Sequence, residues 1–239
     1  MPAGIIITMM TSRTTIRMAD AGLLRLLAWL SPAFPTGGYA WSHGVEWAVE
    51  TGEIRDGETL HDWLDITLRH GAGRTDAILL RHAHRAAGNP DALAELAELA
   101  LALAPTRERR AEAAGQGNAF RAAAASWGAE LLDRLAERAG DLAYPVAVGA
   151  LAGAHGIGED DAAGALVQAF AANLISAAVR LVPLGQSAGL AVLARLEPAI
   201  LAVTAETRAA TLDDLGGACF RSDIASARHE TQYTRLFRS

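Results

Sequence analysis

The chain has 239 residues, a formal net charge of −6 and 51% apolar residues, of which few are aromatic. All 21 basic side chains are arginine, which excludes a P-loop lysine for nucleotide phosphates and a Schiff-base lysine. The negative charge argues against nucleic-acid binding, and the single cysteine excludes an internal disulfide.

The N-terminal region is predicted to be a disordered tail over residues 1–20. Its apolar run, residues 5–10, lacks a preceding basic residue and a cleavage site, so we expect no secretory signal. The sequence therefore predicts a cytoplasmic protein. Beyond the tail we expect one all-helical domain over residues 21–217, followed by a C-terminal tail over residues 218–239.

Apolar residues recur with helical spacing along the whole domain, and no strand pattern occurs. Asn89 and Thr106 are predicted as N-caps, and the pair Gly115 and Gly117 as a close helix crossing. The last long helix is expected to bend or restart at Pro198. In chain order the predicted helices cover residues 23–30, 42–50 (beginning as early as 39), 56–70, 75–87, 90–103, 106–125, 127–139, 144–155, 162–183 and 186–211.

The helix over residues 162–183 is apolar around most of its circumference, so other helices should cover it on most sides. This predicts an all-α, single-domain bundle of about ten helices around a central buried helix. The segment is also long enough for a transmembrane span, but an arginine inside the bilayer is costly, which favours the soluble helix. Its narrow polar strip consists of Asn173, Ser176 and Arg180.

The densest irregular segment, SPAFPTGGYAWSHGVE, covers residues 31–46. Its prolines and its Gly-Gly pair predict a turn, and its aromatic residues predict a loop that folds back onto the body. We call this segment the motif loop; its candidate functional residues are Ser31, Pro32, Pro35, Gly37, Gly38, Tyr39, Gly44 and Glu46.

The C-terminal tail combines arginines with aromatic and aliphatic residues. This composition is typical of interface anchors, but a frayed chain end can have the same composition. Composition alone therefore leaves both interpretations open.

A metal site is the main chemical alternative. His43 with Glu46, and His61 with Asp65, have spacings that place two ligands on one helix face. These four residues would make the protein a helical metal-binding protein or nickel carrier, yet such pairs arise often by chance. The sequence has neither a nucleophile elbow nor a cysteine in a catalytic frame, so we expect a protein that is not an enzyme.

Three segments together resemble the urease accessory protein UreF family: the motif loop, the central helix continuing into VRLVPLGQ, and the tail SDIASARHETQYTRLFRS. The order and spacing match over nearly the whole chain from about Leu23, and the tail is the most specific of the three.

The resemblance implies an all-α homodimer that matures urease without being an enzyme. Such a protein bridges the accessory protein UreD (UreH) and the GTPase UreG and acts on the urease apoprotein. It holds no cofactor itself; nickel and GTP are handled by the complex, and no nucleic acid or membrane is involved. By the same resemblance the tail binds UreD through Ser222, Asp223, Ile224, Arg228, His229, Glu230, Tyr233, Arg235, Leu236 and Phe237.

Two mechanisms remain open for such a protein. It acts as a passive adaptor, or it also modulates the UreG GTPase or guides nickel through a polar passage that includes Asn173, Ser176 and Arg180. For this strip, internal hydrogen bonding or a dimer contact is the favoured interpretation, because buried polar groups are normally satisfied structurally.

Overall fold

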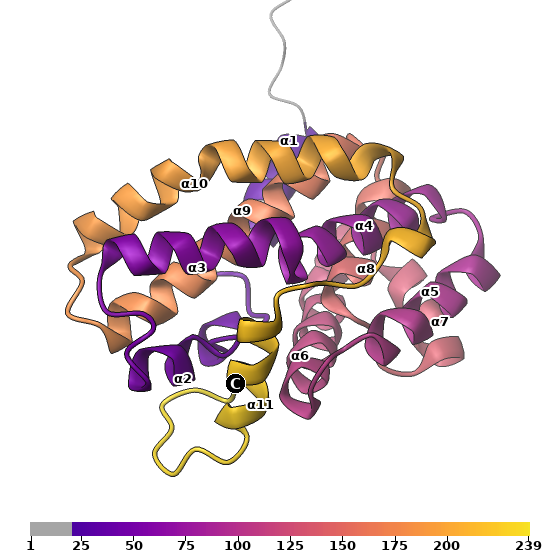
Figure 1. Ribbon diagram of the computed structural model, residues 1–239. Coiled ribbons are helices and arrows are strands. Elements are labelled where there is room, and N and C mark those ends of the chain that lie inside the picture. The colour runs from indigo at the N-terminus through magenta and orange to yellow at the C-terminus, as the bar shows by residue number, and fades with distance from the viewer. Residues whose placement is uncertain (1–20) are drawn as a thin grey trace, which may run out of the picture.

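The computed structural model describes residues 21–239, which form eleven α-helices and no strand (Figure 1). The all-α prediction is confirmed, and the expectation for residues 1–20 lies outside the described residues. The helices are α1 Ala21–Trp29, α2 Val45–Glu50, α3 Gly57–His70, α4 Ala72–Arg85, α5 Pro90–Ala102, α6 Arg107–Ala123, α7 Glu130–Ala139, α8 Tyr144–Ala154, α9 Glu159–Leu181, α10 Gln186–Glu206 and α11 Phe220–His229.

The predicted N-caps are confirmed. The Asn89 side chain accepts a hydrogen bond from the backbone N–H of Ala92, and the Thr106 hydroxyl accepts one from that of Arg109. Each bond satisfies a backbone donor that the first turn of a helix leaves free.

Several helix boundaries differ from prediction. The second helix begins only at Val45, because His43 and Gly44 both have positive φ, which a right-handed helix does not allow. The helix predicted from residue 75 begins at Ala72, and the one predicted from 127 begins at Glu130. No restart occurs at Pro198, which lies on the exposed side of a continuous α10 where water can satisfy the carbonyl it leaves free.

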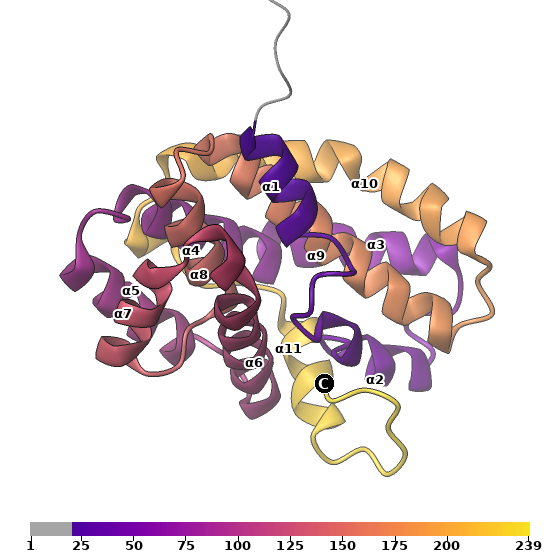
Figure 2. The same ribbon diagram turned by 180° about the vertical axis from the view of Figure 1, so that it is seen from behind.

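Two apolar cores share the central helix. One core lies among α1, α4, α5, α6, α7, α8 and the first turns of α9. The other lies among α2, α3, α10 and the rest of α9, with one alanine each from α4 and α11. Leu166 faces the first core and the adjacent Val167 faces the second. Figures 1 and 2 show the two groups of helices on opposite ends of α9. The prediction that α9 is the central buried helix is therefore confirmed.

Glycines set the closest helix crossing, which joins α4 and α8. A Cβ atom on Gly149 would overlap the backbone of Leu80, and one on Gly153 would overlap the carbonyl of His84. Gly117 of α6 is likewise pressed against the Leu142 backbone, as predicted, whereas the nearest atom to a Cβ on Gly115 would be an ordinary 3.7 Å away in Trp41. Of the two glycines only Gly117 makes a close approach, and its neighbour is the segment that leads into α8 rather than a helix.

Two helices, Glu159–Leu181 and Gln186–Ala209, are long and apolar enough to cross a membrane by length and composition. The first contacts α2, α3, α4, α8 and α10, so packing in the cores accounts for its apolar character. The second keeps an exposed apolar face that includes Leu190 and Leu201.

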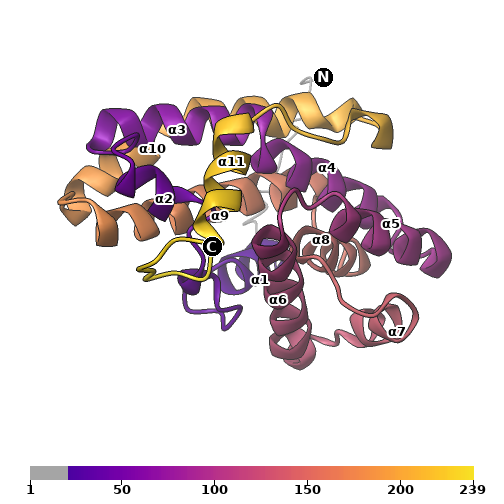
Figure 3. The same cartoon turned by 60° about the horizontal axis from the view of Figure 1, so that its bottom comes forward.

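The C-terminal part of the chain returns to the middle of the molecule. Figure 3 shows α11 beside α2 and near α6, with the last residues close to the motif loop. The two segments that are most distinctive in sequence are thus neighbours in space.

Candidate functional site

Four buried ionisable side chains join the motif loop to the C-terminal segment. They are Glu46 of α2, Glu108 and Glu112 of α6, and His229 of α11, and each is less than a tenth exposed. We call these four residues the polar junction. Buried charges are costly unless they are paired, so their arrangement determines whether this region can fold as it does.

His229 is the centre of the polar junction and is completely buried. Its Nδ1 atom lies 2.8 Å from a carboxylate oxygen of Glu108, and its Nε2 atom lies 3.0 Å from one of Glu46. Ionised carboxylates only accept hydrogen bonds, so both contacts are satisfied when both ring nitrogens carry a proton. The ring therefore bridges the two carboxylates and ties α11 to both α2 and α6.

The carboxylates of the polar junction also hold the end of the chain. Glu46 accepts hydrogen bonds from the backbone N–H groups of Leu236, at 2.6 Å, and Phe237, at 2.9 Å. Arg235 donates to Glu108 at 3.0 Å. One predicted motif-loop residue, Glu46, thus fixes the backbone of the predicted tail directly.

The backbone of the motif loop also contacts the C-terminal tail directly. Ser42 donates its N–H to the Ser239 carbonyl at 2.8 Å. A Cβ on Gly44 would lie 2.9 Å from the backbone nitrogen of Ser226 in α11, and Gly44 also has φ +81°. Both the positive φ and the close approach to α11 require glycine at this position.

The predicted polar strip of α9 makes internal contacts. Asn173 donates to the carbonyl of Gly38 at 3.1 Å, and Arg180 donates to that of Tyr39 at 2.9 Å. The Arg180 guanidinium lies 4.4 Å from the centre of the Phe237 ring, within the range of a cation–π interaction. The strip therefore anchors both the motif loop and the C-terminal segment, which agrees with the favoured interpretation of internal bonding.

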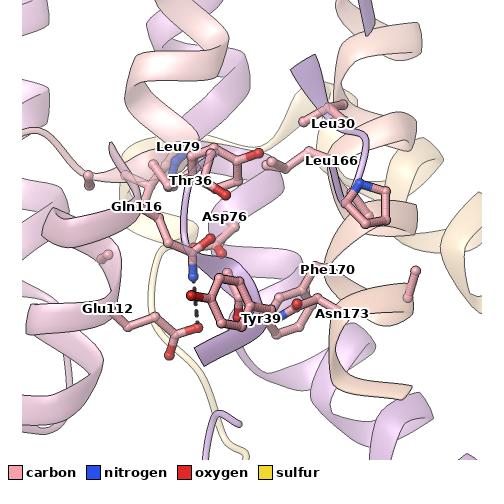
Figure 4. A pocket seen from close by; sticks show the side chains of 18 of the residues that line it. Leu30, Thr36, Tyr39, Asp76, Leu79, Glu112, Gln116, Leu166, Phe170 and Asn173 are labelled. Atoms are coloured by element: carbon pink, nitrogen blue, oxygen red, sulfur yellow. Dashed lines mark hydrogen bonds between the residues drawn. The ribbon is translucent and has the colours of Figure 1, made fainter. Parts of the chain in front are cut away.

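A cavity of about 210 Å³ lies beside the polar junction (Figure 4). The motif loop, Asn173 and Ser176 form part of its wall, and Glu112 lines it as well. Asp76 of α4 also faces it; burial, and to a lesser extent the neighbouring Glu112, raise the pKa of this carboxyl to about 7. Perturbed acids in cavities are frequent at functional sites.

The predicted tail residues divide into two groups. Ser222, His229 and Phe237 are buried in this chain and hold the segment in place. Burial raises the pKa of Asp223, which is half-buried, against an opposing effect from Arg109. Glu230 accepts from the N–H of Arg107 at the start of α6. The outward group is Ile224, Arg228, Tyr233 and Leu236, with Tyr233 fully exposed.

The motif-loop residues divide in the same way. Gly38, Gly44 and Glu46 make the internal contacts described above, and Gly37 has the positive φ that the turn requires. Pro32 and Pro35 are exposed, as is most of Tyr39. The Ser31 hydroxyl accepts a hydrogen bond from the Ala33 N–H.

The four residues of the predicted metal site have separate partners. His61 contacts Asp62, and Asp65 accepts from Arg69 at 2.9 Å. His43 contacts Arg109 instead, while Glu46 contacts His229. Among residues 21–239 there is no group of three or more His, Cys, Asp or Glu side chains that could hold a metal ion. This geometry does not favour the metal-binding alternative.

Sequence reasoning missed Asp76, Glu108, Arg109 and Glu112. Glu108 and Glu112 are four residues apart in the first turns of a helix, where charged residues dominate, so nothing in the pattern marked them as buried. The sequence did give a weak indication that Asp76 lies on the inward face of its helix, because it precedes the buried Leu79 and Leu80 by one turn.

Fold and site together define an all-helical protein in which buried ionic contacts hold a loop and a C-terminal segment against a central helix. A family model described as UreF matches residues 54–197. Urease accessory protein UreF of Xanthobacter autotrophicus is 54% identical over 225 residues, covering 92% of this chain and 93% of that protein. The protein of that name from Bradyrhizobium diazoefficiens is 50% identical, covering 97% of this chain and 100% of its own. The chain belongs to the UreF family of urease accessory proteins.

Proposed function

We propose that this protein is a non-enzymatic adaptor in urease maturation, which bridges UreD and UreG and supports GTP-dependent insertion of nickel into the urease apoprotein in the cytoplasm. Family membership supports the accessory role. One observation supports the adaptor role: outward side chains are presented on a segment whose backbone is fixed from beneath. Nickel and GTP belong to the complex in this proposal, not to the isolated chain.

The C-terminal segment has the properties of a preorganised binding surface for UreD. Tyr233 and Leu236 are 103% and 65% exposed, yet Glu46 accepts a hydrogen bond from the Leu236 N–H and the Arg235 side chain pairs with Glu108, so the segment is held to the body. Ordering a segment before binding lowers the entropy cost of association. Tyrosine and arginine also dominate interface hot spots, so Tyr233 is the anchor that we expect to matter most.

Capture by UreD tests this surface without disturbing the fold. We expect Tyr233→Ala with Leu236→Ala to lower the affinity for UreD about tenfold or more, because both side chains point outward. The matched control is Leu212→Ala, an exposed leucine outside the segment, which should leave capture unchanged. Equal affinities for all three proteins would show that this segment is not the docking surface.

The homodimer is part of the same proposal. The exposed apolar face of α10, with Leu190 and Leu201 each about two-thirds exposed, supports it because a second copy would remove this face from water. Sedimentation equilibrium of the purified protein should give twice the 25.0 kDa chain mass. A monomer at the concentrations used for the capture experiment would contradict it.

Modulation of the UreG GTPase is a separable second role. A passive adaptor leaves the rate of GTP hydrolysis by UreG unchanged, so measuring this rate with and without the protein separates the two roles. Guidance of nickel along Asn173, Ser176 and Arg180 is not favoured, because Asn173 and Arg180 already donate to the motif loop.

A further inference from the structure

The cavity beside the polar junction contains one acidic group without a partner. The carboxyl group of Asp76 has no hydrogen-bond or ion-pair partner among residues 21–239, and its open side is the cavity itself. Figure 4 shows Asp76 among Gln116, Tyr39 and Phe170. A carboxyl group that lines a cavity and has no protein partner is uncommon, since such groups are normally satisfied by protein, water or a ligand.

The other charges at this cavity are already paired. Arg109 donates to Glu112, and Gln116 donates to Glu112 at 3.2 Å. Asp76 is therefore the one charge in the cavity wall that lacks a counter-charge within the described chain. A cation in the cavity would supply it.

The neutral polar groups of the wall present acceptors. The amide NH₂ of Asn173 is used by the Gly38 carbonyl and that of Gln116 by Glu112, which leaves both amide oxygens free. The two oxygens converge, lying 3.6 and 3.5 Å from the place that a Cβ on Gly38 would occupy. A carboxylate with two converging amide oxygens suits a ligand that carries several N–H donors.

The remaining wall is aromatic and aliphatic. Tyr39, Phe170 and Tyr144 all line the cavity, and aromatic faces attract organic cations. Tyr39 is also 70% exposed, so the cavity reaches the surface beside it. The volume of about 210 Å³ is several times the roughly 30 Å³ that one water occupies in the liquid.

We propose that this cavity binds a small organic cation of the guanidinium or primary ammonium class, with Asp76 as its counter-charge. A divalent metal fits less well, because hard cations take six or more oxygen ligands or several carboxylates, and the wall offers one unpaired carboxylate. An anion would face that carboxylate and two amide oxygens, so it fits this wall less well than a cation does.

Calorimetric titration with methylguanidinium tests the proposal on the full-length protein, with methylurea as the neutral ligand of the same shape. Methylguanidinium should bind, and methylurea should bind at least about tenfold more weakly. Asp76→Asn should abolish this preference, while Asp213→Asn, at an exposed aspartate, should preserve it. The Asn variant keeps the shape of the side chain and removes only its charge, so it is expected to fold.

The number of protons released on binding is a second readout, and a purely structural role of Asp76 would not change it. The titratable or charged groups around the cavity are Asp76 of α4, Arg109 and Glu112 of α6, Tyr144 of α8 and Tyr39, whereas α9 contributes none. Bound cation favours ionised Asp76, so binding at pH 7 should release protons to the buffer, and Asp76→Asn should release none. Equal binding of methylurea, or unchanged binding by the Asn variant, would overturn the proposal.

A free cation and an arginine or lysine side chain of a bound protein share this chemistry. Repeating the titration on the complex with UreD separates them, and only this arm depends on the proposed function. Loss of methylguanidinium binding in the complex would assign the cavity to a partner's side chain, and unchanged binding would assign it to a free cation.

Discussion

Where α8 crosses α4, Gly149 and Gly153 bring two apolar helices into backbone contact, whereas at the polar junction four ionisable side chains hold α2, α6 and α11 together. Both regions are buried. The first is stabilised by close packing, which depends little on pH or salt. The second requires every charge to keep its partner, because a buried charge left alone costs several kcal/mol.

The comparison also separates two kinds of role. The α4–α8 contact lies inside one core and only has to be stable. The polar junction holds the segment that carries Tyr233 and Leu236, so its integrity determines whether those side chains are presented in one arrangement. Elements that take part in regulated binding are commonly drawn from the less stable parts of a fold.

Gly149→Ala should give the largest effect on the helix crossing. The new methyl group would overlap backbone atoms of Leu80, which cannot rotate away as a side chain can. We expect a loss of about 4 kcal/mol or more in the free energy of unfolding, measured by urea denaturation. Gly88→Ala is the control, because nothing lies within 4 Å of the corresponding position. A loss below about 1 kcal/mol would mean that the helices separate easily.

His229→Asn should act on the polar junction alone. Asn carries its N–H donors on one side only, so either Glu46 or Glu108 would lose the ring as a partner, at a cost of about 3 kcal/mol. Because the damage is local, hydrogen exchange should rise about a hundredfold in residues 220–239 and stay unchanged in α8.

The control for this variant is His70→Asn, which changes an exposed histidine. If exchange in α8 rises as much as in α11, then the polar junction and the apolar cores unfold as one unit, and the contrast between the two regions fails.

The apolar cores were predictable from sequence, and the polar junction was not. The cap at Asn89, the close approach at Gly117 and the central helix follow from local patterns and from the spacing of apolar residues. His229 and its two partners are 121 and 183 positions apart along the chain. No local rule links residues at such separations, and the composition of the tail left an interface anchor and a frayed terminus both open. The resemblance singled out both Glu46 and His229 but gave no reason to expect that they touch.

The smallest predicted effect concerns Asp76, whose contribution to the free energy of unfolding depends on pH. Its pKa is about 7 in the folded protein against an ordinary value of 3.8, so the folded state binds more protons than the unfolded state between these values. The stability that Asp76 contributes is therefore fully present below pH 3.8 and is lost as the pH rises through 7. Asp76→Asn has no such loss. Between pH 5 and pH 8, the free energy of unfolding of the variant should gain about 2 to 3 kcal/mol relative to the native protein. Urea denaturation of both proteins at the two pH values measures this gain, and Asp213→Asn should show none. A gain that disappears when methylguanidinium is present would place the cation next to this carboxyl group, because a bound cation removes the penalty for ionising it.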